Sequence, residues 1–145
     1  MLRRLEAVLN SDQVDAGLLD LLAPALTYNG QPLAAGTLVA VRAPLWAAVP
    51  DLHWQLDDVL TEGTAIASRW TIRGTHLADF PHPVLNTAPA TGQTLRVPYM
   101  LFCRIEQGRI VAVWDLVDRL TLFQQVRILP NLGLGDLVPT RAEAS

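Results

Sequence analysis

The spacing of apolar residues changes near Pro50, and this change limits the fold more than any other feature of the sequence. Before Pro50, apolar residues recur at intervals of three and four, as in the stretch from Leu2 to Leu9, which is typical of amphipathic helices. After Pro50, apolar and polar residues alternate, as in "TAIASRWTIR" (residues 64–73), which is typical of strands. Helices followed by a run of antiparallel strands predict an α+β domain.

The first part of the chain predicts three helices. One covers residues 2–9 and stops at Asn10; the second carries leucines between residues 18 and 22 and ends at Pro24. A turn is expected at residues 29–30, and a third helical stretch covers residues 37–49, with Pro44 as a kink or break.

The second part predicts two hairpins of strands. Residues 51–60 pair with residues 64–73 across a turn at Glu62-Gly63, and residues 94–105 pair with residues 109–118 across the turn "EQG". Between the hairpins, residues 75–92 form a proline-rich loop of a length often found in lids and binding loops.

Composition excludes several classes of protein. With 145 residues, 50% hydrophobic and 17% charged, the chain is expected to fold as one domain over residues 1–135, with a frayed tail at 136–145. A net charge of −3 without a basic patch argues against nucleic acid as a partner, and no apolar run is long enough to cross a membrane. The single cysteine, Cys103, is expected to be a buried apolar residue in a reducing, cytoplasmic compartment.

Several short motifs occur together in a fixed order, and they carry a resemblance to a known family. They are "VLNSDQVD", "LLAPAL", "VPDLHW", "EGTAIASRWTIRGTH", "TGQTL", "FCRIEQGRIVAVWDLVD" and "LFQQV". From about Leu5 to Val126 the chain resembles the SnoaL-like polyketide cyclases (ester cyclases) of the NTF2-like superfamily. The resemblance implies a cone of curved, mostly antiparallel sheet, three N-terminal helices, a pocket inside the cone and a homodimer formed through the sheet.

The resemblance also implies a catalytic acid/base. Counted from Gly108-Arg109-Ile110, it falls on Asp115, and Asp118 matches a second acidic position. If the strand alternates strictly, the two carboxylates point to opposite faces, with Val113 and Val117 on the side of Asp115. A carboxylate among apolar neighbours is desolvated, which strengthens it as a base. Asp115 can equally be a paired or solvated strand residue, and an inward-facing Arg69 or Arg73 would pair with it and weaken it.

The polar partners that the family places opposite this aspartate differ here. Its glutamine and histidine positions fall on Tyr99 and Leu101, and its early pocket asparagine falls on Tyr28, next to Asn29. Tyr99 and Tyr28 can donate hydrogen bonds to a substrate oxygen, whereas Leu101 cannot. His76 occupies the family's G-T-H position near the pocket mouth, and Trp70 is either a core residue or part of the pocket wall.

A metal triad of His76, Asp79 and His82 is the other pattern in the chain that could bind a ligand. Its spacing differs from that of a helical zinc site, and the intervening proline loosens the geometry. We therefore expect no metal and no cofactor.

These observations lead to three hypotheses. The first is a cofactor-independent cyclase or isomerase in which Asp115 moves a proton on a hydrophobic, carbonyl-rich small molecule. The second is a non-catalytic module that binds an apolar ligand or dimerises, which the missing histidine favours. The third is an epoxide hydrolase that recruits Asp115, an arginine and Asp118, which the opposite orientation of the aspartates disfavours.

Overall fold

A computed structural model describes residues 1–80 and 87–129. The predicted N-terminal helices are present as α1 (Leu2–Leu9) and α2 (Val14–Leu21), and both bury leucines on one face. The third helical stretch is divided into α3 (Ala35–Ala40) and α4 (Ala43–Ala48). Pro44 cannot extend α3 because its ring removes a backbone donor, but it is tolerated in the first turn of α4.

A short hairpin between α2 and α3 was not predicted. It consists of β1 (Leu22–Tyr28) and β2 (Gln31–Ala34), joined by Asn29 and Gly30 at φ angles of 48° and 82°. Two positive φ angles are typical of the tight turn that matches strand twist. Pro24 lies in β1 where the register shifts, so its missing N–H removes no ladder bond.

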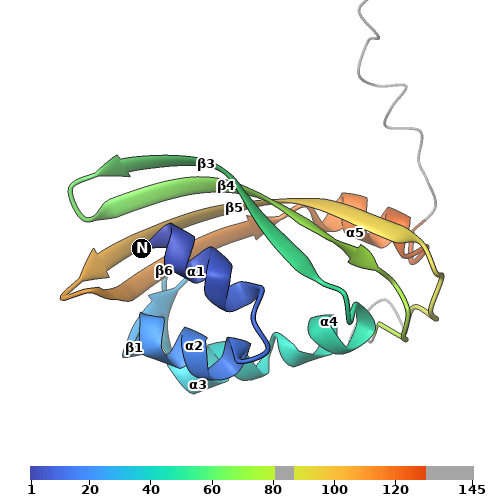
Figure 1. Ribbon diagram of the computed structural model, residues 1–145, viewed down its shortest axis with the longest axis horizontal. Helices are drawn as coiled ribbons and strands as arrows, with labels where there is room; N and C mark the ends of the chain where they lie inside the picture. Colours follow the sequence, from blue (N-terminus) through green and yellow to red (C-terminus); the bar gives the residue numbers. More distant parts are fainter. Residues whose placement is uncertain (81–86, 130–145) are drawn as a thin grey trace, which may run out of the picture.

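The two predicted hairpins of long strands are confirmed. They are β3 (His53–Glu62) with β4 (Ala65–Thr75), and β5 (Thr94–Glu106) with β6 (Arg109–Val117). The six strands form one curved sheet in the order β2-β1-β6-β5-β4-β3, in which β1 runs parallel to β6 and all other pairs are antiparallel. The helices α1 to α3 lie along one side of this sheet, and α5 (Arg119–Gln125) follows β6 (Figure 1).

The core lies between the inner face of the sheet and the helices. Alternation in β4 holds as predicted, with Trp70 and Ile72 buried and Arg69 and Arg73 exposed. Cys103 is fully buried, as expected, and burial raises the pKa of its thiol to about 11. The fold is therefore the α+β architecture that the sequence predicts.

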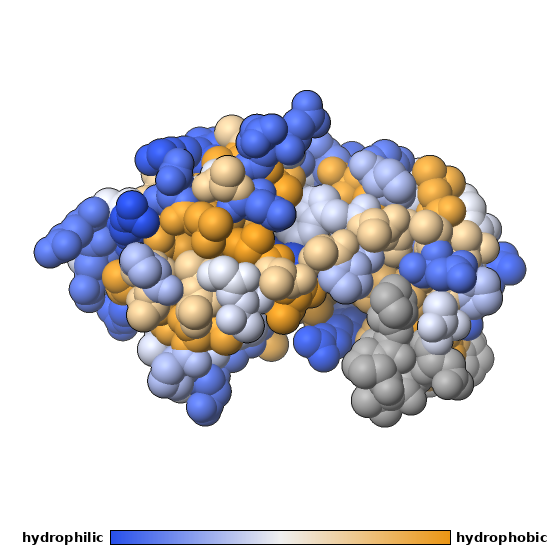
Figure 2. All heavy atoms as spheres, turned by 90° about the horizontal axis from the view of Figure 1, so that it is seen from below, coloured by the Kyte–Doolittle hydropathy of each residue, from blue (hydrophilic) through white to orange (hydrophobic). Residues whose placement is uncertain are grey.

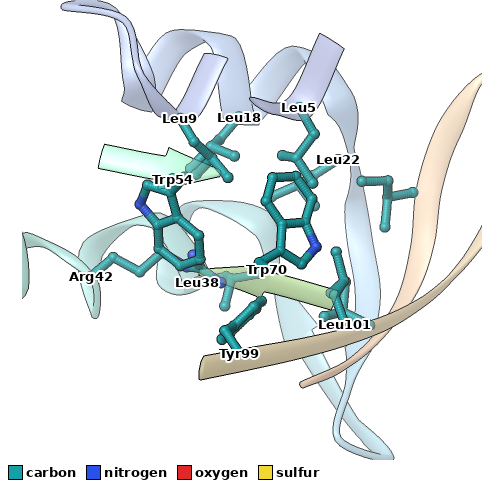
Figure 3. Close-up of a pocket in the computed structure, with 12 residues that line it drawn as sticks. Leu5, Leu9, Leu18, Leu22, Leu38, Arg42, Trp54, Trp70, Tyr99 and Leu101 are labelled. Carbon is teal, nitrogen blue, oxygen red and sulfur yellow. The ribbon is translucent and has the colours of Figure 1, made fainter. Parts of the chain in front are cut away.

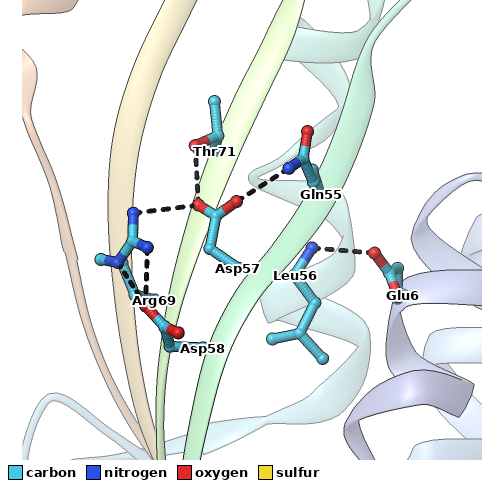
Figure 4. Close-up of polar contacts among 7 residues, drawn as sticks. All are labelled: Glu6, Gln55, Leu56, Asp57, Asp58, Arg69 and Thr71. Carbon is cyan, nitrogen blue, oxygen red and sulfur yellow. Dashed lines mark hydrogen bonds and ion pairs between the residues drawn. The ribbon is translucent and has the colours of Figure 1, made fainter.

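The pairing of β3 with β4 shifts at Asp57, which forms a β-bulge. The Asp57 carboxylate accepts hydrogen bonds from Gln55 at 2.9 Å and from Thr71 at 2.7 Å (Figure 4). Arg69 lies 3.4 Å from Asp57 and 2.6 Å from Asp58, so it turns away from Asp115. The inward arginine that would have paired with Asp115 is therefore not Arg69.

Apolar side chains are also exposed on two surfaces. On the helical side, apolar atoms gather over the half of the molecule that carries α2 and α3 (Figure 2). Leu19 of α2 and Val41, which follows α3, are exposed. On the outer face of the sheet, Met100, Trp114 and Leu116 are exposed. None of the helices in the described residues is both long and apolar enough to span a membrane.

Candidate functional site

A cavity lies between the helices and the inner face of the sheet (Figure 3). Its walls are mostly leucine, isoleucine and tryptophan side chains from α1, α2, α3 and strands β1 and β3 to β6. The lining residues are Leu5, Leu9, Leu18, Leu22, Leu38, Arg42, Trp54, Trp70, Tyr99, Leu101, Ile110 and Val113. Its volume is about 40 Å³, whereas ligand pockets usually measure roughly 300–1,000 Å³. A ligand larger than a few water molecules therefore has to displace side chains of the wall.

Aromatic rings form one wall of the cavity. The Trp54 ring lies 6.4 Å from Trp70 and 5.1 Å from Tyr99, edge to face in both cases. The Trp70 indole donates a 2.8 Å hydrogen bond to Ser68, so its polar atom is satisfied within the core. Trp70 thus contributes ring surface to the cavity, and its N–H is already in use.

Asp115 lies behind this wall and accepts hydrogen bonds from three side chains. The hydroxyls of Tyr28 and Tyr99 each donate to one carboxylate oxygen, both at 2.7 Å, and the Asn29 amide donates at 3.3 Å. The Asp115 side chain is 12% exposed. Among the described residues that line the cavity, Tyr99 and Arg42 approach Asp115, but Asp115 itself is not part of the lining.

The unpredicted β1–β2 hairpin brings two of these donors to Asp115. Tyr28 pairs with Val113 in the parallel β1–β6 ladder, and the Asn29 N–H donates to the Val113 carbonyl at 2.8 Å. The Asn29 side-chain oxygen also accepts the backbone N–H of Asp115 at 2.9 Å. Asn29 therefore orients both the backbone and the carboxylate of Asp115.

Alternation in β6 is interrupted once. The register with β5 shifts at Val111, so Ile110 and Val113 both face the cavity although three residues separate them. From Val113 onward the predicted alternation holds, and Asp115 lies on the inner side and Trp114 on the exposed outer face.

Arg42 is the cation nearest to Asp115, and it was not predicted as a site residue. Its guanidinium lies 3.8 Å from the Asp115 carboxylate and 5.9 Å from the centre of the Trp54 ring. Burial lowers the pKa of Arg42, but its interactions with Tyr99 and Asp115 outweigh burial and raise it overall. The sequence feature that could have identified Arg42 is its position as a lone charge in the apolar stretch "LVAVRAPLW".

Both tyrosines hold their protons firmly. Burial, followed by the hydrogen bond and charge of Asp115, raises the pKa of Tyr28 to about 12. Burial also raises the pKa of Tyr99 well above its usual value, although the Arg42 charge opposes this increase. A phenol has one hydrogen to donate, so in this state neither tyrosine has a free donor for a substrate oxygen.

Asp118 and His76 lie away from the cavity lining. Asp118 is the N-cap of α5 and accepts bonds from the Thr121 N–H at 3.0 Å and from its hydroxyl at 2.6 Å. His76 is fully buried; its Nδ1 lies 3.0 Å from the Thr91 hydroxyl, and its Nε2 has no partner in the described part of the chain. The predicted roles of these two residues in substrate binding stay predictions.

The metal triad cannot be assembled from the residues that the structure describes. His82 lies outside them, and within residues 1–80 and 87–129 no group of three histidine, cysteine or acidic side chains could hold a metal ion. Asp79 instead accepts a hydrogen bond from the Ala90 N–H at 3.1 Å.

A family model described as SnoaL-like polyketide cyclase matches residues 1–126. The chain belongs to this family. A search of curated protein sequences finds no match.

Solved structures of similar fold include other SnoaL-like proteins. IdmH from Streptomyces antibioticus, a candidate polyketide cyclase, is 25% identical, with a TM-score of 0.75 over 87% of this chain and 95% of its own. AclR from Streptomyces galilaeus, a candidate hydroxylase, is 20% identical, with a TM-score of 0.79 over 94% of this chain and 84% of its own. A SnoaL-like protein from Jannaschia sp. CCS1 is 18% identical, with a TM-score of 0.72 over 89% and 90% of the two chains.

Proposed function

We propose that this SnoaL-like protein is a cofactor-independent cyclase or isomerase that moves a proton on a hydrophobic, carbonyl-rich small molecule. The observation that carries the proposal is the carboxylate of Asp115, which reaches an apolar cavity through a single hydrogen bond from Tyr99. Carbonyl groups already acidify a C–H bond between them, so the protein needs to supply a base, a shape and stabilisation of the enolate.

Tyr99 is the group through which Asp115 acts. As the substrate carbon loses its proton to the Tyr99 oxygen, the Tyr99 hydroxyl proton moves to the Asp115 carboxylate at 2.7 Å. The substrate becomes an enolate, Asp115 becomes neutral, and Tyr99 stays protonated, in keeping with its raised pKa. The enolate carbon then attacks a second carbonyl, and the new alkoxide takes a proton from Tyr99, which recovers its own from Asp115.

The decisive experiment compares Asp115→Asn with the wild-type protein on a panel of hydrophobic polyketide esters. General acid/base catalysis contributes about 10²–10⁴-fold, so Asp115→Asn is expected to reduce turnover by roughly that factor. Asp20→Asn, which removes an exposed carboxylate from α2, is the matched control and retains the wild-type rate. Unchanged turnover in Asp115→Asn would exclude this carboxylate as the acid/base.

A non-catalytic ligand-binding module is the second candidate, and Leu101 favours it. Leu101 is paired directly with Asp115 across β5 and β6 and lines the cavity, so an apolar side chain lies where the family has histidine. In that case the panel is bound by the wild-type protein without being converted, and Asp115→Asn changes affinity only.

The epoxide hydrolase alternative has little support from the geometry. It needs two aspartates and an arginine around one water. Arg42 lies near Asp115, but Asp118 is bound to Thr121 at the start of α5.

A further inference from the structure

Arg42 is the cation among the described residues that line the cavity. It follows α3, and its side chain is only 19% exposed. In Figure 3 it enters beside Trp54 and extends towards Tyr99. Burying a guanidinium in an apolar cavity is costly unless the charge is paired.

The pairing of Arg42 is incomplete in this state. The shortest contact between its guanidinium and the Asp115 carboxylate is 3.8 Å, whereas a charge-assisted hydrogen bond measures about 2.7–2.9 Å. The phenols of Tyr28 and Tyr99 occupy the closer positions around Asp115, at 2.7 Å. Arg42 also interacts with Tyr99 through a side-chain hydrogen bond. Because a guanidinium has five N–H donors, Arg42 still retains donors beyond those that Tyr99 and Asp115 can accept.

The other donors of the cavity wall are in use or absent. Tyr99 donates to Asp115 and Trp70 to Ser68, and Leu101 has no donor. Trp54, whose ring packs against Arg42, has a buried indole N–H without a partner in the described part of the chain. Unmet donors are thus concentrated at the Arg42 end of the cavity.

We infer that Arg42 binds the anionic oxygen that forms on the substrate, and that the cavity therefore selects apolar β-dicarbonyl compounds and holds them as enolates. This inference rests on the proposed function. Before the reaction Arg42 faces the Asp115 carboxylate; after the proton reaches Asp115, the negative charge is on the enolate. The net charge of the site is unchanged, so Arg42 exchanges one anionic partner for another without moving into water.

A carboxylate is not the preferred ligand of the wild-type site. A carboxylate would bring a second negative charge to the ionised Asp115, and like charges at close range repel. Replacing Asp115 with asparagine removes this repulsion and leaves Arg42 without its counter-charge. We therefore expect the Asp115→Asn protein to bind preformed enolates and carboxylates more tightly than the wild type.

The test uses acetylacetone, a small apolar β-diketone whose enolate has its own ultraviolet absorption band. The probe is titrated at a pH at which it is mostly neutral when free. In the wild-type protein we expect the ionised fraction of the bound probe to exceed that of the free probe by about tenfold or more, the effect of ~1.4 kcal/mol of differential interaction. Arg42→Gln abolishes this increase, Arg42→Lys retains part of it, and Arg73→Gln, which changes an exposed arginine of β4, behaves as the wild type.

Asp115→Asn separates this inference from the proposed function. It is expected to lose turnover and yet bind the enolate more tightly than the wild type. This gain in affinity can be measured even if the Arg42 variants do not fold. If the bound probe stays neutral in the wild type, or is equally ionised in Arg42→Gln, the role of Arg42 is wrong while the acid/base role of Asp115 can still stand. If Asp115→Asn turns over substrate normally but Arg42 controls ionisation, the proposed function fails and the enolate site stands.

Discussion

At the scale of single residues, the site is organised around a carboxylate that is stabilised before any ligand enters. Tyr28, Tyr99 and Asn29 all donate to Asp115, and Arg42 lies at 3.8 Å. Hydrogen bonds to a charged group each contribute roughly 1.5–3 kcal/mol. The donors fix the position of Asp115, and in the proposed mechanism they leave Tyr99 as the group through which it acts on a substrate.

His76 gives a prediction at the same scale. Burial lowers its pKa, with Asp79 opposing this effect to a smaller extent. As the pH falls, the unfolded chain therefore takes up a proton on His76 before the folded protein does. The contribution of neutral His76 to the free energy of unfolding is fully present above about pH 6.5 and is lost as the pH drops through the lowered pKa of the folded protein. Denaturant titrations between about pH 8 and pH 5 should show a shallower decline for His76→Gln than for the wild type.

The control for this titration is His53→Gln, which removes an exposed histidine from β3. It should reproduce the wild-type pH dependence. If His76→Gln and the wild type decline in parallel, the protonation of His76 does not limit stability in this range.

At the scale of secondary-structure elements, Asp118 is a helix cap. Both of its carboxylate oxygens are bound to Thr121, one to the N–H and one to the hydroxyl. Asp118→Ala is therefore expected to lower the free energy of unfolding by about 0.5–2 kcal/mol, whereas Asp118→Ser, which can cap, loses less. Urea denaturation measures both; equal losses in the two variants would contradict the capping role.

The contact between β4 and the segment after α4 gives a second prediction at this scale. A Cβ on Gly74 would overlap the Val49 side chain and lie 3.2 Å from Asp51. Gly74→Ala is thus expected to destabilise the protein by about 1–3 kcal/mol. Gly36→Ala, in α3, meets nothing within 4 Å and should stabilise the helix by roughly 0.5–1 kcal/mol. Thermal unfolding compares the two; a stabilising Gly74→Ala would show that the strand can move away from Val49.

The elements differ in how far the sequence determines them. The long hairpins follow from alternation, and α1 and α2 from helical spacing. The β1–β2 hairpin was missed because Pro24 suggested only the end of a helix, whereas its pairing with β6 depends on partners more than 80 residues away in the sequence, such as Val113 for Tyr28. Arg42 was missed for the same reason: no local pattern states which carboxylate a lone arginine will face.

At the scale of the whole molecule, the exposed apolar surface of the sheet supports the predicted homodimer. Met100, Trp114 and Leu116 are 50%, 39% and 75% exposed, and they occupy neighbouring positions on β5 and β6. Clusters of exposed apolar side chains often mark protein interfaces. We expect a dimer in analytical ultracentrifugation and a monomer for Leu116→Asp, with Val41→Asp on the helical side as the control. A monomeric wild-type protein would contradict this arrangement.

The most direct measurement of the central claim is the exchange of substrate hydrogen with solvent. An apolar β-keto ester is incubated in deuterium oxide with the protein, and loss of the signal of the hydrogen between the carbonyls is followed by nuclear magnetic resonance. The account predicts that the wild-type protein accelerates exchange and that Asp115→Asn and Tyr99→Phe each lose most of this acceleration, about 10²-fold or more for Asp115→Asn. Acceleration that persists unchanged in Asp115→Asn would contradict it.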